Sequence, residues 1–89
     1  MIKIEYTAEA KQDLNGEYEL YKLLNPLQID CNICFTPEHI VIIVYQLEHV
    51  QLCIDTLKTS NTVEYSYTHY YMSEEDIPEQ WFIRCIRKQ

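Results

Sequence analysis

The amino-acid sequence predicts an α+β protein with a ferredoxin-like βαββαβ order and one extra C-terminal strand. Segments with apolar residues at every second position alternate with segments whose apolar residues recur at helical spacing. The chain of 89 residues contains only one Gly and three Pro, which leaves few irregular loops. We therefore expect a single α+β domain over residues 1–89, built as an antiparallel sheet with two helices on one face.

The N-terminal part reads as a strand followed by a helix. Apolar and charged residues alternate over residues 2–6, which is typical of a half-buried strand. Thr7 is a suitable cap for a helix predicted over residues 8–24. The buried stripe of this helix would contain Ala10, Leu14, Tyr18, Tyr21 and Leu24. Gly16 allows a kink within the helix, and Pro26 ends it.

The middle of the chain is its most hydrophobic part and predicts two strands. Residues 29–35 have one apolar face, and residues 40–45 begin with five consecutive β-branched side chains. Residues 36–39 would then form a hairpin loop. An alternative remains open, because Thr-Pro-Glu is also a good helix start and the following apolar residues fall in helical phase. That alternative gives one long helix over residues 37–58 and the order βαβαββ.

The C-terminal half predicts one helix and two strands. Apolar residues at helical spacing favour a helix over residues 46–58. Alternation of mainly aromatic with mainly polar residues favours a long strand over residues 62–72. An acidic link over residues 73–79 then leads to a last strand over residues 81–88.

Charge and composition restrict the class of partner. The net charge is −7, and all fourteen acidic residues precede residue 82. Such a chain repels phosphate, so we expect a basic protein partner and no direct binding of nucleic acid. The N-terminus lacks the pattern of a signal peptide, and the longest apolar run is too short to span a bilayer. Four Cys residues without a secretory signal read as free thiols, and we expect a cytoplasmic protein that does not contact membranes.

No motif in the sequence carries recognisable chemistry. Cys31 and Cys34 have the C-x-x-C spacing, but in a strand their side chains point to opposite faces, so both are expected to act as small hydrophobic residues. Cys34 with His39 is the only pairing that could serve a ligand- or metal-sensing module, or a thiol enzyme. No local signature supports either alternative. We expect no enzyme activity, no cofactor and no metal site.

Two groups of residues are candidate partner-binding surfaces. The first is acidic and contains the i, i+4 series Glu9, Asp13 and Glu17, with Glu74, Glu75 and Asp76. The second is aromatic and contains Tyr65, Tyr67, Tyr70 and Tyr71, for which both interface and core positions are open. These surfaces predict an inhibitor or immunity-type protein of phage or mobile-element origin. A more specific form of this prediction is a protein that mimics DNA. A homodimer through an uncovered sheet face is also compatible with the pattern.

Overall fold

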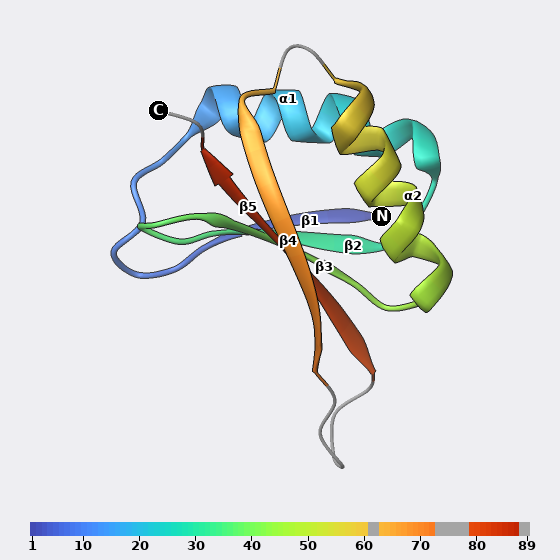
Figure 1. The fold of residues 1–89 in the computed structure, drawn as a ribbon. Helices are drawn as coiled ribbons and strands as arrows, with labels where there is room; N and C mark the ends of the chain where they lie inside the picture. Colours follow the sequence, from blue (N-terminus) through green and yellow to red (C-terminus); the bar gives the residue numbers. More distant parts are fainter. Residues whose placement is uncertain (61–62, 73–78, 88–89) are drawn as a thin grey trace.

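A computed structural model describes residues 1–60, 63–72 and 79–87 of the chain. The elements follow the order β1 (Ile2–Tyr6), α1 (Leu14–Leu24), a 3-10 turn (Asn25–Leu27), β2 (Cys31–Phe35), β3 (Ile40–Val44), α2 (Leu47–Thr59), β4 (Tyr65–Met72) and β5 (Gln80–Arg87). The five strands form one mixed sheet, and both helices lie on the same side of it (Figure 1). The α+β class is confirmed, and the elements follow one another along the chain in the expected order.

The ferredoxin-like strand order is wrong. The strands lie in the order β1-β2-β3-β5-β4, and β1 pairs directly with β2 in parallel orientation, so the sheet is not fully antiparallel. The two strands are parallel because α1 connects them as a crossover, which returns the chain in the same direction. In the ferredoxin-like arrangement another strand would separate these two. The remaining pairs, β2 with β3, β3 with β5 and β4 with β5, are antiparallel.

The hairpin between β2 and β3 is confirmed, and the alternative helix over residues 37–58 is wrong. Thr36 closes the turn, because its backbone N–H donates to the carbonyl oxygen of His39 at 2.9 Å and its hydroxyl donates to the same oxygen at 2.8 Å. The backbone N–H of His39 in turn donates to Oγ1 of Thr36 at 3.0 Å. The β-branched residues of β3 favour the strand, since they lose rotamer freedom in a helix.

Helix α1 begins at Leu14 and not at residue 8. Asp13 is its N-cap, and Oδ1 of Asp13 accepts a hydrogen bond from the backbone N–H of Gly16 at 3.0 Å. The backbone N–H of Asp13 donates to the hydroxyl of Tyr6 at 2.9 Å, which fixes the cap against β1. The predicted buried stripe is also wrong except for Leu24. The buried residues of α1 are Gly16, Leu20 and Leu24.

One hydrophobic core lies between the helices and one face of the sheet. Alternate residues of β2, β3 and β5 point into it and meet α1 and α2. Its fully buried members with the largest side chains include Leu20, Leu24, Ile33, Ile42 and Ile83. In the described part of the chain, neither helix is long and apolar enough to cross a membrane.

Candidate functional site

The sheet face opposite the helices is the first candidate binding surface, and we call it the open face. Strand register shows how its side chains line up across the sheet. One row runs from Glu5 through Cys34 and Val41 to Arg84 and Thr68. A second row runs through Lys3, Asn32, Ile43, Phe82 and Tyr70. No described helix or strand covers either row, because α1 and α2 both pack on the other face (Figure 1).

The middle of the open face is apolar, with one cation beside it. Val41, Ile43 and Phe82 are half-buried on this face. Phe82 packs edge to face with Tyr70, with ring centroids 5.6 Å apart. The guanidinium carbon of Arg84 lies 5.3 Å from the Tyr70 ring centroid, a cation–π contact. Nε of Arg84 is buried, and within residues 1–60, 63–72 and 79–87 it has no hydrogen-bond partner. The face therefore combines an apolar patch with an incompletely satisfied donor.

The outer face of α1 is the second candidate surface. Leu14, Tyr18 and Tyr21 are 63%, 67% and 46% exposed, although large apolar side chains are usually more covered. They are spaced i, i+4 and i+7 and so form one stripe on the helix, opposite the buried residues. Glu17 lies in the first turn beside this stripe, and the Lys22 ammonium lies 6.0 Å from the Tyr18 ring centroid. We call Leu14, Tyr18 and Tyr21 the α1 stripe.

The acidic residues singled out from the sequence do not form one helical series. Glu9 lies in the loop before α1, Asp13 caps the helix, and only Glu17 is helical. Asp13 is held by its hydrogen bonds to Gly16 and Tyr6, so it is less available to a partner than its spacing implied. Glu74, Glu75 and Asp76 lie outside the described residues.

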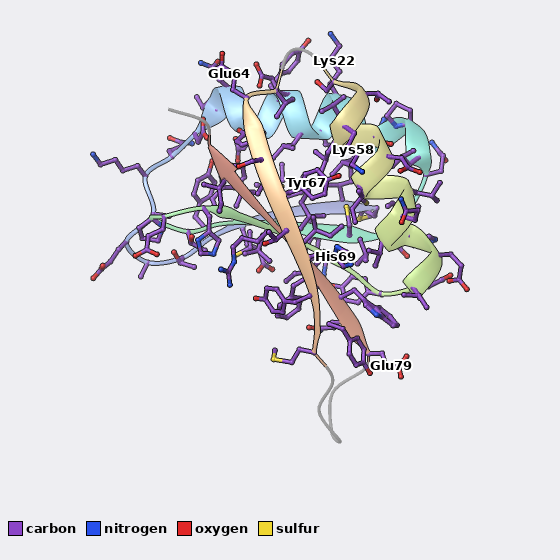
Figure 2. All side chains as sticks on the ribbon, viewed as in Figure 1. Lys22, Lys58, Glu64, Tyr67, His69 and Glu79 are labelled. Carbon is purple, nitrogen blue, oxygen red and sulfur yellow. The ribbon has the colours of Figure 1, made fainter. Side chains whose placement is uncertain are left out.

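The four tyrosines of β4 divide between three environments. Tyr65 and Tyr67 are half-buried and pack against the core. Tyr70 belongs to the open face, and Tyr71 stacks at a tilt on Trp81, with ring centroids 5.4 Å apart and 55% of Tyr71 exposed. Figure 2 shows Tyr67 and His69 along β4, with Glu64 at its end near α1 and Glu79 at the far end of the β4–β5 ribbon. The strand is therefore part core and part surface.

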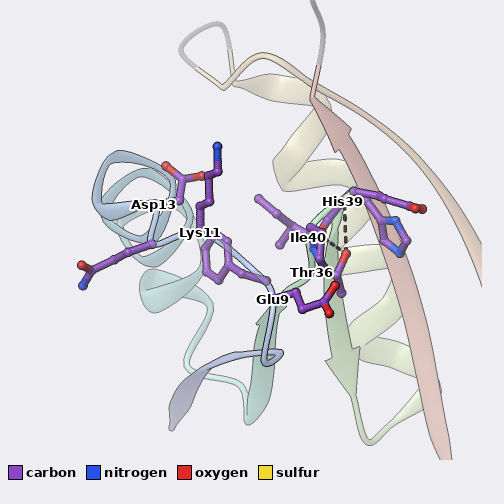
Figure 3. A pocket seen from close by; sticks show the side chains of 10 residues that line it. Glu9, Lys11, Asp13, Thr36, His39 and Ile40 are labelled. Carbon is purple, nitrogen blue, oxygen red and sulfur yellow. Dashed lines mark hydrogen bonds between the residues drawn. The ribbon is translucent and has the colours of Figure 1, made fainter.

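A cavity of about 470 Å³ lies between the loop before α1 and the β2–β3 turn. Its lining includes Glu9, Asp13, Glu38 and His39, and in Figure 3 the Glu9 side chain extends from its loop toward the turn. Cys34 is not part of this lining. Over the described ranges, no three His, Cys, Asp or Glu side chains are placed to hold a metal ion. The Cys34–His39 pairing considered from the sequence is thus not assembled at this cavity.

The cysteines take the positions expected from the alternation. Cys31, Cys53 and Cys85 are buried, and Cys34 lies half-buried on the open face, which is more apolar than expected. Burial raises the pKa of Cys53 and of Cys85 to about 12. Burial and the charge of Glu5 also raise the pKa of the Cys34 thiol. A raised pKa disfavours the thiolate, which is the nucleophilic form.

Sequence reasoning missed the central residues of both surfaces. The signal for the open face was present, because residues 40–45 are apolar on both faces and only one can meet the helices. The helical spacing of Leu14, Tyr18 and Tyr21 predicts the buried side of α1, whereas the structure exposes all three side chains. Comparison with protein-family models, with curated proteins and with solved structures finds no match.

Proposed function

We propose that this protein is a small acidic protein-binding factor that presents helix α1 to a basic protein. The observation that carries the proposal is the α1 stripe. Its i, i+4 and i+7 spacing is the anchor pattern of a helix that lies in the hydrophobic groove of a partner. Exposed apolar side chains are common when they are scattered, but these three lie together in one stripe, and Tyr is enriched among the residues that anchor interfaces.

Charge indicates the kind of partner. The net charge of −7 favours association with a basic protein and raises the rate of encounter at low ionic strength. Glu17 borders the α1 stripe, and Glu9 lies exposed in the loop before the helix, so both are placed to meet basic side chains at the rim of a groove. An inhibitor of a nucleic-acid-binding protein is the specific form of this proposal, in which the factor competes with nucleic acid for the basic surface.

The experiment compares capture of partners by the native chain and by a double variant, Leu14→Ser with Tyr18→Ser. Both side chains are more than half exposed, so the variant is expected to keep the fold. A Tyr71→Ser variant is the control, since Tyr71 is also more than half exposed, at 55%, but lies on β4. We expect the native chain and the control to capture a basic protein that the double variant does not capture.

Direct binding of that purified partner then tests the electrostatic part. Its affinity should fall as salt rises, and charge reversal at Glu9 and Glu17 should weaken it further. Displacement of the factor by nucleic acid would support the inhibitor form. The proposal would be refuted if the double variant captured the same partner as the native chain, or if the captured partner were itself acidic.

A further inference from the structure

The open face has a specific charge pattern in addition to its apolar centre. Among the described residues of this face, three side chains are charged. Lys3 and Glu5 lie on edge strand β1, and Arg84 lies on β5. Glu5 and Arg84 share one row of the sheet but are separated by three strand spacings, roughly 14 Å, so they cannot pair within one chain. Between them lie Cys34 and Val41.

We propose that the open face binds the open face of a second copy of this chain. Two sheets that pack face to face keep their strands nearly aligned and interdigitate their side chains. A two-fold axis parallel to the strands and lying between β2 and β3 exchanges β1 with β5. It therefore brings Glu5 opposite Arg84 of the second copy, and it does so twice in one dimer. Cys34 then meets Val41 of the second copy between the two ion pairs.

Three observations favour a second copy of this chain, and not the basic protein proposed to bind α1, as the partner of the open face. The residues of the open face that the structure describes carry two cations and one anion, which does not suit a basic protein. The buried Nε of Arg84, with no partner in the described part of the chain, gains an acceptor when Glu5 of the second copy approaches. The half-buried Val41, Ile43 and Phe82 lose their remaining contact with water.

The size of the open face also suits a dimer. With the axis between β2 and β3, the four strands β1, β2, β3 and β5 face those of the second copy. At about 4.8 Å apart, with five to eight residues of about 3.3 Å each, they span roughly 19 Å by 17–26 Å. This is of the same order as the ~800 Å² that each partner contributes to a standard interface. The inference goes beyond the binding of a basic protein by α1, because it uses the opposite side of the sheet.

The test is sedimentation equilibrium of the full chain and of charge-reversal variants. The native chain should sediment at twice its mass of 10.7 kDa. Glu5→Arg and Arg84→Glu should each weaken dimerisation by about tenfold or more, because each places like charges opposite one another twice. The double variant, Glu5→Arg with Arg84→Glu, should restore it. Glu5→Arg makes the chain less acidic and Arg84→Glu makes it more acidic, so general repulsion between acidic chains cannot account for two losses.

A matched variant distinguishes the open face from the free edge of the sheet. His69→Glu places a charge in the middle of edge strand β4, on the side of the sheet opposite the open face, and should leave the dimer intact. Loss of the dimer in His69→Glu with none in Glu5→Arg would overturn the proposal in favour of edge pairing. A chain that stays monomeric at millimolar concentration would overturn it outright.

Methyl chemical shifts of the native chain provide a measurement that needs no variant. On dilution through the dimer transition, the methyl signals of Val41 and Ile43 should shift, because they lie on the open face. Those of Ile33 and Ile42 should not, because they are fully buried on the covered face. Shifts confined to the covered face, or to the α1 stripe, would contradict the open-face dimer.

Discussion

Replacing Asp13 by alanine should lower the stability of the fold, because Asp13 is the N-cap of α1. Its carboxylate accepts a hydrogen bond from the Gly16 N–H at 3.0 Å, which satisfies a backbone donor that the helix itself leaves without a partner. Loss of such a cap costs about 1 kcal/mol, within a range of about 0.5–2 kcal/mol. For a domain of this size, each 1 kcal/mol lowers Tm by roughly 4–8 °C. We expect Asp13→Ala to melt about 4–8 °C below the native chain in thermal unfolding followed by circular dichroism.

Two further variants separate the cap from the charge. Asp13→Asn keeps an oxygen acceptor at the same position, and Asn caps helices about as well as Asp, so it should lose about 0.5 kcal/mol or less. Glu9→Ala removes an exposed carboxylate from the neighbouring loop and should stay within about 0.5 kcal/mol of the native chain. Equal losses in Asp13→Ala and Asp13→Asn, or no loss in either, would refute the capping role. In that case Asp13 would return to the group of partner-binding carboxylates.

Two other predictions concern the two faces of the sheet and the buried thiols of Cys53 in α2 and Cys85 in β5. Ile42→Ala should lower the free energy of unfolding by about 2–5 kcal/mol, because Ile42 is fully buried. Ile43→Ala, measured at a concentration where the chain is monomeric, should lower it by less than half of that, because Ile43 is half-buried on the open face. Equal urea midpoints for the two variants would show that the open face is covered within one chain. Because the folded-state pKa of Cys53 and of Cys85 is raised from 9.0 to about 12, their contribution to stability is complete below about pH 9 and is lost as pH rises to about 12. The urea midpoint of unfolding should therefore fall as the pH rises from about 9 to about 12. A midpoint that stays level to pH 12 would contradict the burial of these thiols. At neutral pH, a thiol reagent should label Cys34 before the other cysteines.

The hairpin illustrates how far local sequence can decide between competing structures. Thr36 and Pro37 are compatible with either a helix start or a turn. The five β-branched residues that follow favour a strand by their own rotamer preferences, and β3 forms over Ile40–Val44. The same alternation placed Cys31 and Cys34 on opposite faces, since a period of two fixes side-chain direction wherever the strand sits.

The start of α1 shows where local patterns fail. The apolar residues Leu14, Tyr18 and Tyr21 have helical spacing, and periodicity alone cannot say whether an apolar stripe is buried or presented to a partner. Gly16 lacked a signal of burial because it has no side chain, yet it lies on the packed face with Leu20 and Leu24. Which face of an amphipathic helix meets the core depends on what the rest of the chain offers it.

The sequence by itself determined the α+β class, the number and order of the main helices and strands, and the burial of Cys31, Cys53 and Cys85, because these follow from periodicity and rotamer preference within short segments. Only the tertiary structure decided the strand order β1-β2-β3-β5-β4, the parallel β1–β2 pair, and the alignment of Glu5 and Arg84 in one row of the open face. Those features depend on pairing between segments far apart in the chain, for which a single sequence contains no local signal. The two surfaces on which both proposals rest arise in the same way, as what remains uncovered after distant elements have packed together.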